Sequence, residues 1–192
     1  SYGRINFLMK NRHGTPFEHN SMTFFVQAPI CVFREFHRHR IGWSYNEMSG
    51  RYRELPANYY MPPPQRPMIQ QGKPGQYKFV LPEAEQYYDC VVAMDKAYTR
   101  ATESYRELLE LGIAKEVARM VLPVGLYSEM YATCNARSLM AFLSLRTQVE
   151  GSTFPSYPMW EIAEIAQQME EAFAEAFPLT YKSFNENGRV CP

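Results

Sequence analysis

An arginine- and histidine-rich segment is the part of the sequence best suited to chemistry. It begins with His37-Arg38-His39-Arg40 and continues into a run of Ser, Asn, Gly, Arg and aromatic residues from Ser44 to Tyr52. The planar guanidinium group of arginine binds phosphate or carboxylate through two parallel hydrogen bonds, which the point charge of lysine cannot do. The segment therefore predicts a site for an anionic ligand.

Composition and spacing alone leave three interpretations of this segment open. Glu35, His37 and His39 could ligate a metal ion, but the neighbouring arginines would repel a cation, so we expect no metal. Arginines interleaved with aromatic side chains could instead bind RNA phosphates and stack on bases. The same groups could also hold a phosphorylated planar small molecule. A solvated basic surface without a ligand is the alternative to all three.

The composition of the whole chain excludes several classes of protein. The 192 residues carry 20 basic and 20 acidic side chains, and 46% of them are hydrophobic, which is typical of a folded domain and excludes a disordered chain. A net charge of zero argues against a general nucleic-acid binder, which normally has a basic excess. No run approaches 18 uncharged apolar residues, so we expect no membrane span. The four cysteines are scattered without a CxxC pair, which favours free thiols and a cytoplasmic protein.

Hydrophobic periodicity predicts the elements of the N-terminal half. We expect a helix over residues 2–11, a strand over 22–26, and a helix that begins at Pro29 and ends near Phe36. Residues 41–55 are expected to form an ordered functional loop. Apolar positions from Ala84 to Leu108 alternate in steps of three and four, which predicts a long amphipathic helix ending at Gly112. These apolar positions form a seam along one side of the helix. We favour packing of this seam on the protein's own core over a coiled-coil dimer contact.

The C-terminal half contains a second group of predicted elements. Residues 115–121 should be helical, 126–133 a strand, and 135–146 and 160–177 helices. The last helix has five glutamates and no basic residue, so we expect a solvated face. Asn135 and Arg146 are 11 residues apart and lie within about 20° on one helix face, whereas Arg137 lies on the opposite face. We therefore expect Arg137 to form a structural or intersubunit salt bridge.

Four separated motifs together resemble one known family. Arg38-His39-Arg40 with Ser49-Gly50-Arg51-Tyr52 resembles the signature of the flavin-dependent thymidylate synthases. Further segments resemble that family in the same order, namely residues 13–19, 119–123, and 135–139 through Leu145-Arg146. Because the resemblance extends from Tyr2 to the final helix, chance similarity is a remote explanation.

The resemblance implies a reaction, a fold and an assembly. It implies reductive methylation of dUMP to dTMP, with FAD as bound cofactor, methylenetetrahydrofolate as carbon donor and NADPH as reductant, without a covalent enzyme nucleophile. It also implies a single α+β domain over residues 1–192, with an antiparallel sheet flanked by long helices, that lacks an N-terminal strand and helix. Members are homotetramers with shared active sites, so the expected partners are dUMP and further copies of the chain, not nucleic acid or a membrane.

The resemblance also implies roles for individual residues. Arg146 and Arg38 should act catalytically at the pyrimidine, where a guanidinium stabilises charge that develops on a carbonyl oxygen. The dUMP site is implied to contain Glu35, Arg38, Glu47, Ser49, Gly50, Arg51, Arg119 and Arg146. The FAD site is implied to contain His13, Thr15, Glu18, Arg38, His39, Arg40, Ile41, Asn46, Glu47, Asn135 and Leu145.

Some of these residues also have a structural interpretation, and the sequence departs from the family pattern at several positions. Without the resemblance, His13 and Thr15 would be helix-capping residues and Glu18 the partner of a nearby arginine. Ser49 has no evident base to activate it as a nucleophile, so we assign it to phosphate. The signature has one extra residue near Gly42, Ala141 replaces a frequent asparagine, and residues 151–158 form an extra loop. A silent nucleotide- or RNA-binding relative and a different flavin enzyme are the rival functions.

Overall fold

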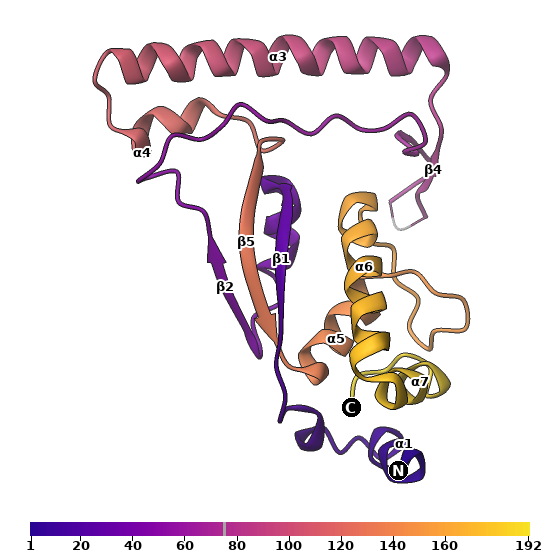
Figure 1. Ribbon diagram of the computed structural model, residues 1–192. Coiled ribbons are helices and arrows are strands. Elements are labelled where there is room, and N and C mark those ends of the chain that lie inside the picture. Colours follow the sequence, from indigo (N-terminus) through magenta and orange to yellow (C-terminus); the bar gives the residue numbers. More distant parts are fainter. Residues whose placement is uncertain (75) are drawn as a thin grey trace. The chain divides into compact units, whose positions relative to one another are not determined.

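The computed structural model describes residues 1–74 and 76–192, which divide into two compact units. The first unit contains Ser1–Gln27, Val32–Glu47 and Glu129–Pro192, and the second contains Ala28–Cys31 and Met48–Ser128. Helices and antiparallel strands occur together along the chain (Figure 1), which confirms the predicted α+β class. The assignment of residues 1–192 to a single domain stays a prediction.

A three-stranded antiparallel sheet supports the first unit. Its order is β1 (Met22–Pro29), β5 (Tyr127–Cys134) and β2 (Trp43–Glu47), so that β5 is the central strand (Figure 1). The register of β2 against β5 begins with Trp43 opposite Cys134. Apolar residues on alternate positions of β5 are buried, as expected for a strand with one face on the core.

The helices of the first unit supply most of its apolar core. They are α1 (Tyr2–Lys10), η1 (Thr15–Phe17), α2 (Ile30–Phe36), α5 (Ala136–Arg146), α6 (Trp160–Ala176) and α7 (Pro178–Glu186). α5 packs on α6, α6 on α7, and α1 on α7. The largest fully buried side chains of these helices include Phe33, Phe36, Phe142, Phe173, Phe184, Met9 and Leu139.

The second unit is arranged around one long helix. It contains β3 (Ile69–Gln71) paired with β4 (Lys78–Val80), then α3 (Ala84–Glu110), α4 (Lys115–Ala118) and η2 (Arg119–Val121). Gly112 follows the helix with a φ of 78°, a left-handed conformation that suits the predicted glycine C-cap. The long helix and the helical segment after it are confirmed.

The seam of α3 packs differently from the core that we expected. Only Tyr105 of the helix is buried, because the seam lies along an extended, proline-containing segment and contacts its backbone through hydroxyl groups. Tyr98 donates to the Tyr60 carbonyl at 3.0 Å and Tyr87 donates to the Pro62 carbonyl at 3.0 Å. The backbone N–H of Leu55 donates to the Tyr105 hydroxyl at 3.2 Å. The helix therefore packs on an irregular segment and not on a sheet.

Several predicted elements need correction. Residues 43–47 of the expected loop form β2, because Trp43 and Tyr45 alternate with polar residues and stack at 5.6 Å. Pro29 ends β1 and does not begin a helix. Neither α7 nor the β3–β4 hairpin was predicted from the sequence. The face of α6 is not fully solvated either, since Glu170 is buried with Arg189.

Candidate functional site

The first unit brings Glu35, His39 and Arg146 together at the C-terminal ends of two helices. Arg146 is the last residue of α5, and its Nη1 lies 2.5 Å from Glu35 Oε2. Its Nη2 donates to the Glu35 carbonyl at 3.2 Å, and its Nε donates to His39 Nε2 at 3.0 Å. The guanidinium is thus fixed by three acceptors, while the side chain keeps 16% of its surface exposed. A group held in this way is preorganised to donate hydrogen bonds to a ligand.

His39 is held in its neutral form. Burial, together with the nearby charge of Arg146, lowers the pKa of His39 from 6.5 to about 4. An Nε2 atom that accepts from Arg146 carries no proton, which agrees with this direction. The ring packs edge-on against Phe142, and the Tyr45 hydroxyl lies 2.7 Å from the His39 carbonyl. A neutral His39 can therefore orient Arg146 without repelling it.

Two arginines next to His39 carry free positive charge. Arg38 and Arg40 are both exposed, and neither forms an ion pair with any other residue that the structure describes. Guanidinium groups in this state bind phosphate without first having to break an internal bond. The segment therefore presents two available cations, one on each side of His39 in the chain, and His39 itself contacts Arg146.

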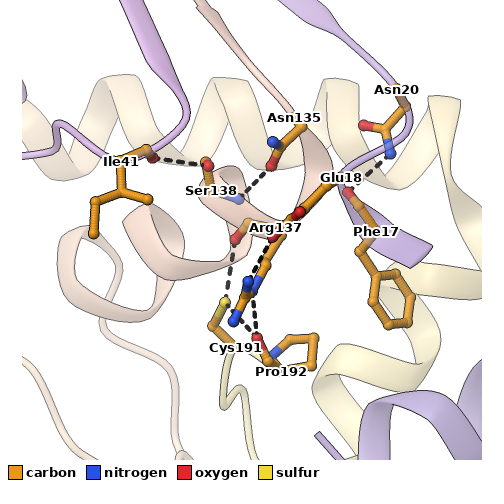
Figure 2. A network of polar contacts seen from close by, with 9 residues as sticks. All are labelled: Phe17, Glu18, Asn20, Ile41, Asn135, Arg137, Ser138, Cys191 and Pro192. Carbon is orange, nitrogen blue, oxygen red and sulfur yellow. Dashed lines mark hydrogen bonds and ion pairs between the residues drawn. The ribbon is translucent and has the colours of Figure 1, made fainter. Parts of the chain in front are cut away.

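The N-terminus of α5 forms a second polar cluster (Figure 2). Asn135 caps the helix, since its Oδ1 accepts from the Ser138 backbone N–H at 2.9 Å. The Ser138 hydroxyl donates to the Ile41 carbonyl at 2.9 Å. Gly42 has a φ of 71°, and a Cβ there would lie 2.1 Å from the Ser138 hydroxyl oxygen. Only glycine permits this close turn, so the extra residue near Gly42 is accommodated by contact with α5.

Arg137 joins three distant segments of the first unit (Figure 2). Its Nη1 lies 2.5 Å from Glu18 Oε1, and its Nε donates to the Pro192 carbonyl at 2.7 Å. The bond to Glu18 raises the pKa of Arg137, so the guanidinium stays charged. The structural salt bridge predicted for Arg137 is confirmed. Glu18, expected at the flavin, is held here by an arginine, and its flavin contact stays a prediction.

The second unit gathers the other predicted nucleotide residues. The Arg51 backbone N–H donates to the Ser49 hydroxyl at 3.3 Å, and a Cβ on Gly50 would lie 3.3 Å from Arg119 Cδ. Arg51 Nε lies 2.9 Å from Glu116 Oε2, with both side chains about half exposed. Exposed pairs contribute at most about 1 kcal/mol, so Arg51 can exchange this carboxylate for a stronger anion. These residues form a compact donor group suited to phosphate.

The remaining predicted positions lie at the surface of the first unit. His13 stacks on Phe7, and Leu145 keeps 56% of its surface exposed at the end of α5. The other exposed side chains of this set are Thr15, Asn46 and Glu47. Glu35 and His39, considered above as metal ligands, both contact the Arg146 guanidinium. Among the described residues, no group of three His, Cys, Asp or Glu side chains is placed to hold a metal ion.

Glu116 and Arg189 are two structural partners that were not predicted from the sequence. Glu116 is one turn before Arg119, and only the fold brings it to Arg51. Arg189 is buried against Glu170, and a helix with five glutamates and no basic residue was the available signal that a distant cation is required.

The sequence matches a known family over nearly its whole length. The profile of Thy1, thymidylate synthase complementing protein, matches residues 2–179. This chain belongs to the Thy1 family. It is 59% identical over 192 residues to the flavin-dependent thymidylate synthase of Streptomyces coelicolor, covering 100% of this chain and 78% of that protein. It is also 52% identical over 190 residues to the one from Tropheryma whipplei strain TW08/27, covering 99% and 79%.

A solved structure agrees with this membership. The crystal structure of the UMP/dUMP methylase PolB from Streptomyces cacaoi, bound with 5-Br UMP, superposes with a TM-score of 0.97 at 50% identity. The match covers 100% of this chain and 84% of that one. The predicted family, its α+β fold and an enzyme of the flavin-dependent thymidylate synthase type are therefore confirmed. Within the described residues, no helix is long and apolar enough to cross a membrane.

Proposed function

We propose that this Thy1 protein methylates dUMP at C5 to give dTMP, with methylenetetrahydrofolate as carbon donor and NADPH-reduced FAD as hydride source. The observation that carries the proposal is the fixed guanidinium of Arg146, which is bonded to neutral His39. The exposed Arg38 and Arg40 flank His39 in the chain. A cationic donor group of this kind suits a nucleotide whose base must accept negative charge. The names of the relatives support the same reaction.

Each donor group of the chain has a defined task in this proposal. Ser49, Gly50, Arg51 and Arg119 hold the dUMP phosphate and sugar, together with Glu47. Arg146 and Arg38 lie at the pyrimidine, where Arg146 donates to a carbonyl oxygen. This bond strengthens as charge moves onto that oxygen while C5 reacts, which lowers the barrier without a covalent enzyme nucleophile. Glu35 and His39 keep the guanidinium oriented.

The first unit has donors of the kind that FAD requires. Arg38, His39 and Arg40 with the Asn135 end of α5 offer cationic and polar groups that suit the diphosphate and the planar ring system. His13, Thr15, Glu18, Ile41, Asn46, Glu47 and Leu145 complete the proposed contacts. When bound, FAD supplies the hydride chemistry, and the protein supplies orientation and electrostatics.

Tritium release from dUMP labelled at C5 tests the reaction. The FAD-loaded protein with NADPH and methylenetetrahydrofolate should release tritium, because methyl transfer replaces that hydrogen. Labelled UMP is assayed in parallel, since the PolB methylase is named for both nucleotides. NADPH oxidation without tritium release from either nucleotide would contradict the proposal and favour a different flavin enzyme. Nucleotide or RNA binding without flavin uptake would favour the silent binding protein.

The Arg146→Ala variant tests the role of the guanidinium. We expect methyl transfer to fall by about 100-fold, the range for removing one donor to a developing oxyanion. Flavin reduction by NADPH should fall much less, because that half-reaction does not place charge on the pyrimidine. Arg100→Ala, which removes an exposed arginine of α3, is the control. Equal losses in both half-reactions would make Arg146 a structural residue.

A further inference from the structure

A buried arginine beyond the family match organises the C-terminal part of the first unit. The family profile ends at residue 179, and Arg189 lies after it with only 5% of its surface exposed. Its guanidinium donates to both carboxylate oxygens of Glu170, at 2.6 and 3.0 Å, and to Asn185 Oδ1 at 2.6 Å. Its Nη2 also donates to the Thr147 hydroxyl at 2.8 Å.

The last of these bonds leads directly to the candidate site. Thr147 follows Arg146, and its hydroxyl donates to the Leu143 carbonyl at 2.6 Å while it accepts from Arg189. The carbonyl of Thr147 accepts from the Ser156 hydroxyl at 2.6 Å. The final turn of α5 is therefore fixed on both sides of Thr147. A helix end without such partners frays, because its last carbonyl groups have no bond within the helix.

The backbone of Arg189 itself adopts a conformation that is unfavourable for a non-glycine residue. Gly188 and Arg189 have φ values of 70° and 57°, both in the left-handed region that a non-glycine residue rarely enters. The Arg189 backbone N–H donates to the Phe184 carbonyl, and the Gly188 carbonyl accepts from the Thr153 backbone N–H at 2.9 Å. The turn thus also ties down the loop that follows Arg146. Such strain persists where the surrounding structure enforces it.

We propose that Arg189 is a positioning residue for Arg146, acting through the Thr147 hydroxyl. The inference rests on the proposed function, in which Arg146 binds the pyrimidine. Arg146 makes three directional bonds to Glu35 and His39, so a shift of the helix end by a fraction of an ångström misaligns it. Arg189 holds that end of the helix without touching the nucleotide.

The test removes the connecting hydroxyl and keeps the buried ion pair. Thr147→Val has nearly the same shape and leaves Arg189 bonded to Glu170, so the fold is retained. Thr147→Ser restores the hydroxyl. Thr180→Val makes the same change at another buried threonine of the unit and is the matched control. Hydrogen–deuterium exchange of the peptide around residues 143–147 reports the anchoring, and titration of the FAD-loaded protein with dUMP reports its consequence.

We expect Thr147→Val to exchange faster at residues 143–147 and to raise the dUMP dissociation constant about fivefold, as for the loss of one ordinary hydrogen bond. Thr147→Ser and Thr180→Val should resemble the wild type in both measurements. Unchanged exchange in Thr147→Val would overturn the anchoring. Faster exchange with unchanged dUMP affinity, when Arg146→Ala does lose affinity, would overturn the positioning role. If Arg146→Ala itself binds dUMP normally, the pyrimidine contact in the proposed function fails, whereas the exchange result still decides the anchoring.

Discussion

The arginines of the candidate site form hydrogen bonds and ion pairs with other residues. The strength of these bonds decides whether an arginine stays in place or changes its partner when a ligand binds. Arg146 is nearly buried and has three acceptors, whereas Arg51 is half exposed and has one. A guanidinium held by several partly buried bonds is costlier to move than one held by a single exposed pair. We therefore expect Arg146 to act from a fixed position and Arg51 to change its partner when an anion binds.

Arg51→Ala should weaken dUMP binding and leave the fold unaffected. Loss of a charge-assisted hydrogen bond to phosphate should cost about 1.5 to 3 kcal/mol of binding free energy. The free energy of unfolding should change by less than about 0.5 kcal/mol, because the bond to Glu116 is an exposed one. Calorimetric titration with dUMP and urea unfolding measure the two quantities.

Arg100→Ala is the control for this experiment, since it removes a comparable exposed pair with Glu103 in the same unit. It should leave dUMP binding unchanged. An Arg51→Ala protein with wild-type dUMP affinity would exclude Arg51 from the phosphate site.

His39 should make the stability of the fold depend on pH below neutrality. Its pKa is lowered to about 4, against 6.5 for an exposed histidine, so between these values the unfolded state binds more protons than the folded state. The contribution of neutral His39 is therefore complete above pH 6.5 and is lost as the pH falls toward 4. Urea unfolding of the wild type and of His39→Gln from pH 4 to 7 measures it. The wild type should lose more stability on acidification, and equal slopes would contradict a buried neutral His39.

At the scale of elements, close backbone contacts position the site as much as side chains do. The turn before β2 approaches the N-terminus of α5 so closely that Ile41 accepts from Ser138 and Gly42 has no room for a side chain. This contact joins the arginine-rich segment to the helix that ends in Arg146. A change at the turn should therefore affect both.

Gly42→Ala should destabilise the first unit by about 1 to 3 kcal/mol, the cost of a left-handed conformation at a non-glycine residue. The added Cβ also displaces the Ser138 hydroxyl and breaks its bond to Ile41. Gly3→Ala is a matched control, because Gly3 lies in α1 with open space around it, and should stabilise the protein by up to about 1 kcal/mol. Urea unfolding of both variants checks the opposite signs, and a neutral Gly42→Ala would contradict the close turn.

The elements that the sequence predicted well are those with a long regular pattern. α3 and α5 repeat apolar residues over several turns, and Asn135 and Gly112 mark their ends. β2 was missed because its residues also have the composition of a binding loop. α7 was missed because it is short and polar, although Pro178 at its start was a usable signal.

The candidate site was predictable in its residue types but not in its internal bonds. The family resemblance implied Arg146, Glu35 and His39, yet their contacts join positions more than a hundred residues apart. The local sequence does not identify Arg189 as the partner of Glu170, since the two residues meet only after α6 and α7 have packed. Contacts of this kind follow from tertiary packing, which periodicity does not encode.

At the scale of the whole molecule, the exposed apolar surface favours self-association. Leu111 and Met120 keep 76% and 77% of their surface exposed, and further large apolar side chains of the second unit are exposed between Tyr77 and Val124. Light scattering should give a particle of four 22.4 kDa chains, as the homotetramer predicted for this protein requires. Met120→Glu should dissociate the tetramer and reduce methyl transfer. Phe7→Glu, which places the same charge at an exposed residue of α1, is the control and should do neither. A stable monomer with full activity would refute the shared-site assembly.

The hydroxyl contacts along α3 also restrict how the chain can vary in length. Tyr87, Tyr98 and Tyr105 contact the extended segment at three points along the helix. One inserted residue between the first two would rotate them by about 100° relative to each other, and the three contacts could not form together. We therefore expect single insertions and deletions to be disfavoured between Tyr87 and Tyr105. Homologues of different size should differ in the connections, such as residues 148–159.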